Sequence, residues 1–294
     1  MYYTTWCNDK IIKIIKTYIR AYKVSVYDEK THTGVLRHLV TKVGFASKEV
    51  MVVLVANGRK LPYLNELASV LKENIPGFKT LVVNVNREKT NVILGNENRV
   101  IYGDGKINDN IGDLVFEISP LSFFQVNPVQ TEVLYNKALE YAALGENDTV
   151  FDIYCGIGTI SLFLAQRAKK VYGIEIVEEA IKDAKRNAEI NNLDNVEFYV
   201  GKAEDVVPKM YKQGKRANVV VVDPPRKGCD EKVLDTIVSM QPDRVVYVSC
   251  NPSTLARDLA YLNEKGYKSL EVQPVDMFPH SVHIENVALI VKDK

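Results

Sequence analysis

The chain has 294 residues, of which 46% are hydrophobic and 26% are charged, and its net charge is +1. This is the composition of a soluble globular protein long enough for two domains. Its balanced charge excludes a global positive field for nucleic acid, although a local basic face is compatible with it. No apolar run approaches the ~20 residues of a membrane span. The N-terminus lacks the pattern of a signal peptide, and the four cysteines have no paired spacing, so we expect a cytoplasmic protein with reduced thiols and no membrane contact.

The first part of the chain predicts a small α+β domain over residues 1–126. Apolar residues recur at helical spacing near the N-terminus, and β-branched runs separated by turn residues follow. The expected elements are a helix over 8–23, a hairpin of strands over 34–43 and 49–55, a helix over 64–73, a strand over 81–86, and short strands and turns over 91–127.

From residue 148 the pattern changes to a regular alternation of strands and helices. A helix over 128–144, capped by Asn127, precedes it. Strands are expected over 149–154, 170–176, 195–200, 218–223, 244–249, 269–273 and 287–291, with helices such as 160–168 and 178–191 between them. This alternation predicts a doubly wound, Rossmann-like α/β domain over residues 127–294 with a mostly parallel sheet.

A cysteine directly follows one of these apolar strands. The run from Val245 to Ser249 is followed by Cys250, Asn251 and Pro252. A buried parallel strand that ends there delivers the thiol to the carboxyl edge of the sheet, where open α/β folds bind ligands. The alternative is that Cys250 is a small buried hydrophobe, as most cysteines are.

The first strand of the alternation ends in a glycine loop. Gly156 and Gly158 allow a tight turn close to a ligand, and Glu175, at the end of the next strand, suits the two hydroxyls of a ribose. The third glycine of the dinucleotide pattern is missing, which disfavours a nicotinamide-dependent oxidoreductase. The loop therefore indicates an adenosine ligand without phosphates, such as S-adenosylmethionine. The alternative for Glu175 is a solvated acid at a strand end.

Two acids complete a hypothesis about the chemistry. Asp223 is followed by two prolines, and such a loop serves amino-group methyltransferases, which is one alternative. A nucleophile such as Cys250 is needed instead for methylating an unactivated carbon such as C5 of uracil, and Glu285, among apolar neighbours, suits the base that removes the C5 proton. His280 and His283 lack a fourth ligand at zinc spacing, so no metal site is expected.

The sequence resembles the S-adenosylmethionine-dependent RNA (uracil-5-)-methyltransferases, which make 5-methyluridine in ribosomal or transfer RNA. The motifs that carry the resemblance are Asp223-Pro224-Pro225-Arg226-Lys227-Gly228, Tyr247-Val248-Ser249-Cys250-Asn251-Pro252-Ser253-Thr254 and Asp276-Met277-Phe278-Pro279-His280-Ser281-Val282-His283-Ile284-Glu285.

The resemblance implies that Cys250 is the nucleophile and Glu285 the base. It also implies that Gln125, Tyr154, Glu175 and Asp223 contact S-adenosylmethionine, that Asp223 lies near the target uracil, and that Phe123 stacks on the extruded base. The alternative for Phe123 is hydrophobic core. The expected partner is RNA, ribosomal rather than transfer RNA, and the expected state is a monomer.

The chain departs from the family pattern at its N-terminus. Many members begin with a small β-barrel RNA-binding domain followed by a cysteine cluster that holds an iron–sulfur centre. Neither is evident here, so we expect no iron–sulfur cluster in this chain. A further alternative is a non-catalytic RNA-binding module that retains the fold; failure to bind S-adenosylmethionine would support it.

Overall fold

The computed structural model describes residues 2–58 and 60–293, and the chain divides into two compact units. The first unit comprises Met1–Asn110 and Glu117–Leu121, and the second comprises Ile111–Phe116 and Ser122–Lys294. The hairpin of β5 (Ile107–Ile111) and β6 (Leu114–Ile118) contributes residues to both units. The domain boundary expected after residue 126 stays a prediction.

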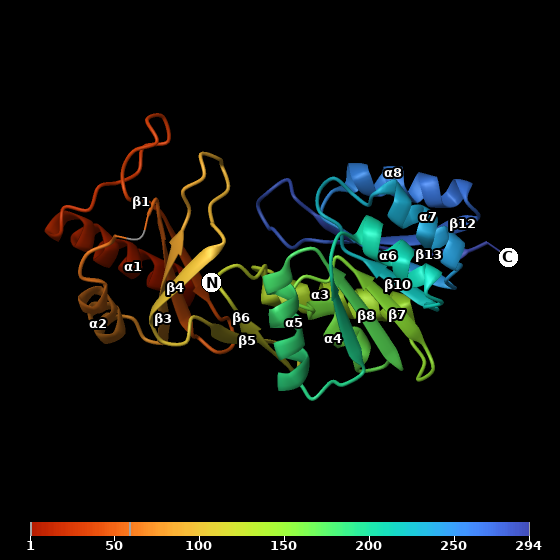
Figure 1. Cartoon of the computed structure of the whole chain (residues 1–294). Helices are drawn as coiled ribbons and strands as arrows, with labels where there is room; N and C mark the ends of the chain where they lie inside the picture. Colours follow the sequence, from red (N-terminus) through yellow and green to blue (C-terminus); the bar gives the residue numbers. More distant parts are fainter. Residues whose placement is uncertain (1, 59, 294) are drawn as a thin grey trace. The chain divides into compact units, whose positions relative to one another are not determined.

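The first unit is a four-stranded sheet with two helices packed on one face (Figure 1). Its elements are α1 (Tyr2–Ala21), β1 (Leu36–Val43), β2 (Val50–Ala56), α2 (Leu64–Asn74), β3 (Phe78–Val85) and β4 (Glu97–Tyr102). The predicted hairpin is present as the antiparallel pair β1–β2, and α2 connects the parallel pair β2–β3.

The N-terminal helix is longer than the prediction, which started it at residue 8. It already includes Cys7, whose side chain is fully buried one turn before Ile11 and two turns before Ile15. A cysteine at this spacing acts as a small hydrophobe and extends the apolar stripe towards the N-terminus. No helix in the described residues is long and apolar enough to cross a membrane.

The second unit contains the predicted doubly wound sheet. Its seven strands lie in the order β12-β13-β11-β10-β7-β8-β9. They are β7 (Thr149–Ile153), β8 (Lys170–Glu175), β9 (Val196–Val200), β10 (Val219–Val222), β11 (Arg244–Ser249), β12 (Tyr267–Val275) and β13 (Glu285–Lys292). Strands β7 to β11 pair in parallel, whereas β13 lies antiparallel between β11 and β12.

Helices cover both faces of this sheet (Figure 1). One face carries α3 (Pro128–Ala142), α4 (Thr159–Ala165) and α5 (Glu178–Ile190); the other carries α6 (Ala203–Lys212), α7 (Glu231–Met240) and α8 (Pro252–Glu264). The predicted cap of α3 is confirmed, because the Asn127 side chain accepts a hydrogen bond from the N–H of Gln130 at 3.3 Å. We call the face covered by α3 the α3 face.

Candidate active site

The register of β11 and β13 brings the proposed nucleophile and the proposed base together. The antiparallel register of the two strands is regular and ends with Ser249 paired with Asn286. Continued by one residue, it places Cys250 opposite Glu285. Residues opposite each other in an antiparallel pair lie on the same face of a sheet, with Cβ atoms ~5 Å apart. Glu285 is the first residue of β13, and not part of the loop before it as the sequence suggested.

Asp223 lies on the same face. Side chains alternate along a strand, and Val221 on β10 and Val248 on β11 both pack in the core beneath the α3 face. Two residues beyond each of these, Asp223 and Cys250 return to that face. The carboxyl edge of the sheet therefore presents a thiol and two carboxylates on one side.

Burial and mutual repulsion change the protonation of these groups. Desolvation raises the pKa of Cys250 above its ordinary value, and the charges of Glu285 and Asp223 raise it further. Desolvation likewise raises the pKa of Glu285, which is 4% exposed, and that of Asp223. The exposed Arg226 opposes the shifts of Cys250 and Glu285 through its positive charge. A carboxylic acid with a raised pKa suits proton transfer near neutral pH.

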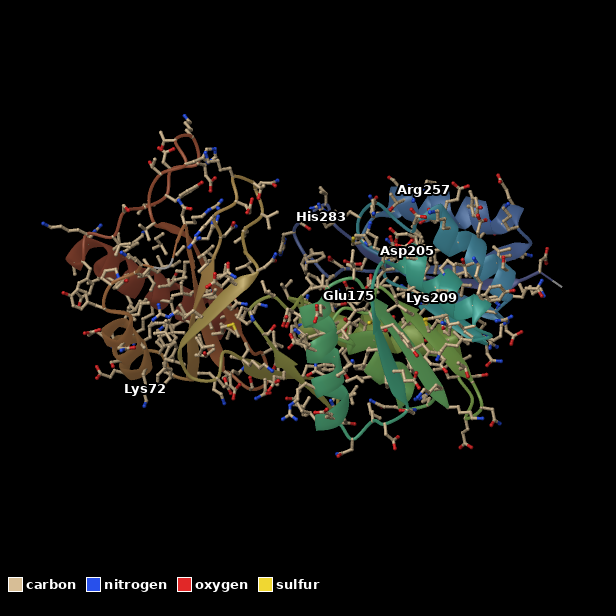
Figure 2. The ribbon with its side chains drawn as sticks, viewed as in Figure 1. Lys72, Glu175, Asp205, Lys209, Arg257 and His283 are labelled. Carbon is tan, nitrogen blue, oxygen red and sulfur yellow. The ribbon has the colours of Figure 1, made fainter. Side chains whose placement is uncertain are left out.

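The glycine loop lies beside this edge, after β7. Tyr154, Gly156 and Gly158 all have positive φ values, of 70°, 55° and 81°, and an added Cβ on Gly158 would lie 3.0 Å from the ring of Phe198. The loop is bound to β8 because Glu175, labelled in Figure 2, accepts a hydrogen bond from the N–H of Gly156 at 3.2 Å. The acid predicted to bind a ribose is thus hydrogen-bonded to the predicted glycine loop. Glu175 is half-buried and is not a fully solvated acid at a strand end.

Two buried side-chain oxygen atoms of the second unit lack a hydrogen-bond donor. Gln125 Oε1 and Asp152 Oδ1 have no hydrogen-bond partner among the described residues, and both side chains are more than nine-tenths buried. Buried acceptors of this kind are rare unless a ligand or water satisfies them. They fit a cofactor that carries hydrogen-bond donors and a positive charge, which is the character of the sulfonium and ammonium groups of S-adenosylmethionine.

Asp152 was not singled out from the sequence, although an acid inside a buried strand is itself a signal. Its Oδ2 accepts a hydrogen bond from Ser161 at 2.5 Å. Burial raises the pKa of Asp152 from 3.8 to about 7, and the charge of Glu175 adds to the rise.

The Asp152→Asn variant is expected to be more stable than the parent at alkaline pH. Because the folded pKa is raised, the unfolded chain releases this proton first, so the free energy of unfolding falls as pH rises from about 4 to about 7. Asparagine has no proton to lose, so its advantage should grow by about 2–3 kcal/mol between about pH 5 and pH 8. Urea unfolding at both pH values measures this; an advantage that does not change with pH would contradict the shift.

The segment before α3 is held at both ends. The Ser122 hydroxyl donates to Asp183 on α5 at 2.5 Å, and Asn127 Nδ2 donates to the carbonyl of Met277 at 3.2 Å. Between these anchors Phe123 is 73% exposed, so the alternative that it belongs to the core is wrong. An exposed aromatic ring on an anchored segment is suitable for stacking on a base.

Other groups do not join this site as ligands. In residues 2–58 and 60–293, no three His, Cys, Asp or Glu side chains are arranged to hold a metal ion. His280 and His283 are exposed, and the His283 ring packs edge-on against Phe278. Cys155 and Cys229 are buried, whereas Cys250 is partly exposed, so only Cys250 of these three thiols is open to a substrate.

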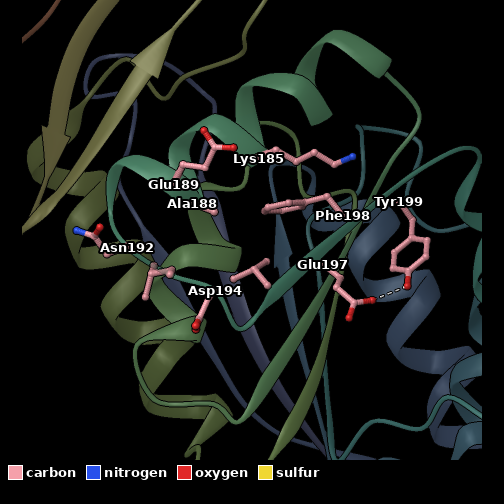
Figure 3. A pocket seen from close by; sticks show the side chains of 10 residues that line it. Lys185, Ala188, Glu189, Asn192, Asp194, Glu197, Phe198 and Tyr199 are labelled. Atoms are coloured by element: carbon pink, nitrogen blue, oxygen red, sulfur yellow. Dashed lines mark hydrogen bonds between the residues drawn. The ribbon is translucent and has the colours of Figure 1, made fainter.

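A separate open pocket of about 750 Å³ runs along β9 and α5 (Figure 3). Glu197 lines it, and hydrogen bonds from Lys170 and Tyr199 lower the pKa of Glu197 to about 2. This carboxylate is fully paired with neighbours of the same chain, so it has a structural explanation and adds nothing to the site at the carboxyl edge.

The class of protein follows from the fold and the site: this is a Rossmann-like methyltransferase fold. A sequence model of the tRNA (uracil-5-)-methyltransferase family matches residues 13–293. The chain is similar to two uncharacterized RNA methyltransferases, from Caldanaerobacter subterraneus subsp. tengcongensis and Clostridium tetani. Each is 55% identical over an alignment that covers 96% of this chain, and the alignments cover 63% and 61% of the relatives' own lengths. The chain therefore belongs to the tRNA (uracil-5-)-methyltransferase family.

A solved structure supports the same conclusion. The crystal structure of Pyrococcus abyssi tRNA (uracil-54, C5)-methyltransferase in complex with S-adenosyl-L-homocysteine matches with a TM-score of 0.81 and 35% identity. The match covers 96% of this chain and 66% of that one. The chain thus spans about three fifths to two thirds of the relatives that it matches.

Proposed function

We propose that this chain transfers a methyl group from S-adenosylmethionine to C5 of a uridine in RNA, through a covalent bond between Cys250 and C6 of the uracil. The observation that carries the proposal is the register that sets Glu285 opposite Cys250 on the face that also holds Asp223. A nucleophile and a base are both needed for methylating the pyrimidine carbon, and membership of the family supports the same chemistry.

The thiolate of Cys250 starts the reaction. It adds to C6, so that a C–S bond forms and the electron pair of the C5–C6 double bond becomes an enolate, with its charge shared between C5 and O4. When bound, S-adenosylmethionine would supply the electrophilic methyl group for C5, and the electron pair of the broken S–CH3 bond would stay on the sulfur of a neutral thioether. Glu285 then takes the proton from C5, the C5–C6 double bond re-forms, and the thiolate is expelled.

The remaining residues hold the two substrates. Glu175, Tyr154, Gln125 and the loop of Gly156 and Gly158 are proposed to bind the cofactor. The buried acceptor of Gln125 and the positive-φ turn after β7 support this assignment. Asp223 would contact both cofactor and uracil. It follows β10, which pairs with β11, and it lies on the α3 face, where its negative charge helps to raise the pKa of the Cys250 thiol after the larger effect of desolvation.

Phe123 would stack on the extruded base. Its 73% exposure on an anchored segment supports this role. The proposed target is ribosomal rather than transfer RNA, although the similar Pyrococcus enzyme is a tRNA methyltransferase by name. A monomeric state and a cytoplasmic location remain predictions.

Trapping with 5-fluorouridine tests the proposal. With fluorine in place of hydrogen, C5 has no proton for the base to remove after methyl transfer, so elimination cannot occur and the protein remains attached to the RNA. We expect a covalent adduct, stable in denaturing gels, with 5-fluorouridine-substituted ribosomal RNA and S-adenosylmethionine. Substituted transfer RNA in a parallel reaction separates the two RNA classes. Absence of a Cys250-dependent adduct with every RNA would refute the mechanism.

A further inference from the structure

Helix α8 begins directly after the Cys250 turn and holds the loop that follows Asp223. Asn251 Nδ2, at the N-cap of α8, donates to the carbonyl of Arg226 at 2.9 Å, and Thr254 Oγ1 donates to the same oxygen at 3.2 Å. Arg257, labelled in Figure 2, donates to the carbonyl of Lys227 at 3.0 Å. Three side chains from the N-cap and first turns of α8 thus donate to the carbonyls of two consecutive loop residues.

Asp258 is the centre of this arrangement. Its side chain is 1% exposed, and its carboxylate accepts hydrogen bonds from three donors. These are the N–H of Cys229 at 2.8 Å, the hydroxyl of Tyr247 at 2.6 Å and Nε of Arg257 at 2.8 Å. A buried carboxylate is costly unless its oxygens are satisfied, so the charge fixes the loop, β11 and α8 relative to one another.

The network reaches the glycine loop as well. Desolvation raises the pKa of the Cys229 thiol, and the neighbouring side chains of Tyr247 and Tyr154 oppose that rise. Tyr154 follows β7, Cys229 follows β10, and Tyr247 lies on β11. The loop after β10 and the strand β11 therefore meet at a single buried carboxylate, and Tyr154 lies next to the thiol of Cys229 in this loop.

Packing leaves little freedom around this carboxylate. Gly228 has a φ of +80°, and an added Cβ would lie 2.4 Å from Arg257 Nη2 and 2.7 Å from Asp258 Oδ2. The loop backbone is thus in close contact with α8, and a change in the position of Asp258 must move the loop that carries Asp223.

We propose that Asp258 is a positioning residue for methyl transfer, which sets the aim of the Cys250 thiol relative to Asp223 and Tyr154. The inference rests on the proposed function. Asp258 lies with α8 on the face of the sheet opposite the thiol, away from the reacting groups. Its effect is transmitted through β11 and the loop after β10, where a misplacement of about 1 Å costs on the order of 100-fold in rate.

Single-turnover adduct formation with 5-fluorouridine RNA tests this inference, at saturating RNA and S-adenosylmethionine. The amplitude reports the fraction of correctly folded protein, and the rate constant reports the geometry of the reacting groups. Asp258→Asn should lower the rate constant by about 10- to 100-fold at unchanged amplitude. Tyr247→Phe, which removes one of the three donors, should lower it less.

Asp235→Asn is the matched control. Asp235 is an exposed acid on α7 that accepts a hydrogen bond from the hydroxyl of Tyr261 on α8, so the two residues also form an aspartate–tyrosine pair. The rate constant of Asp235→Asn should equal that of the parent protein. If both Asp258→Asn and Tyr247→Phe lose amplitude but keep the parent rate constant, Asp258 has a purely structural role and the proposal is overturned. The proposal is also overturned if both variants keep the parent rate constant at full amplitude. If Asp258→Asn does not fold, Tyr247→Phe alone decides. Failure of the parent protein to form any adduct refutes the proposed function instead.

Discussion

Cys250→Ala is expected to abolish methyl transfer to C5 of uridine, with a loss of about 10⁴-fold or more in rate. Without the thiolate, C5 has no enolate character and cannot attack a methyl group. Radiolabelled methyl incorporation into RNA, followed by identification of the modified nucleoside, measures the effect. The 5-fluorouridine adduct should disappear in the same variant.

The control for this variant is Cys7→Ala, which removes a buried thiol from α1 in the first unit. It should retain full activity. An amino-group methyltransferase that uses Asp223 and its two prolines would keep its activity in Cys250→Ala, because an amine needs no covalent activation. Retained methylation in that variant would therefore favour this alternative and exclude the covalent mechanism.

Glu285→Gln is expected to accumulate a covalent protein–RNA adduct with ordinary uridine. Addition and methyl transfer do not require the base, whereas elimination does, so the reaction should stop at the methylated adduct and turnover should fall by about 10²- to 10⁴-fold. Denaturing gels and mass spectrometry of the attached nucleotide measure the trapped species. Glu189→Gln, on the exposed surface of α5, is the matched control and should turn over normally.

The same variant tests the electrostatics of the site. The negative charge of Glu285 raises the pKa of the Cys250 thiol, so removing that charge should lower it. Because the thiolate is the reactive form, the rate of adduct formation rises with pH up to the thiol pKa, and this rise should occur at lower pH in Glu285→Gln. An unchanged pH profile would show that the two side chains do not interact as the register requires.

Much of the site could be predicted from local sequence. The glycine loop, Glu175 and Asp223 all stand at strand ends, and strand ends are visible as the limits of apolar runs. Asp152 and Asp258 could not be assigned in the same way. Asp258 looks like any polar residue of a helix, and only the packed loop and β11 reveal that its carboxylate is buried with three donors.

The sequence by itself determined the order of strands and helices in the second unit, the family and the two residues expected to do the chemistry, because helical and strand periodicity and short motifs are local properties of a chain. Only the tertiary structure decided that β13 enters antiparallel beside β11, in the register that sets Glu285 opposite Cys250. The partner, direction and register of a strand depend on contacts between residues distant in sequence, and a shift of one residue would turn Glu285 to the other face of the sheet.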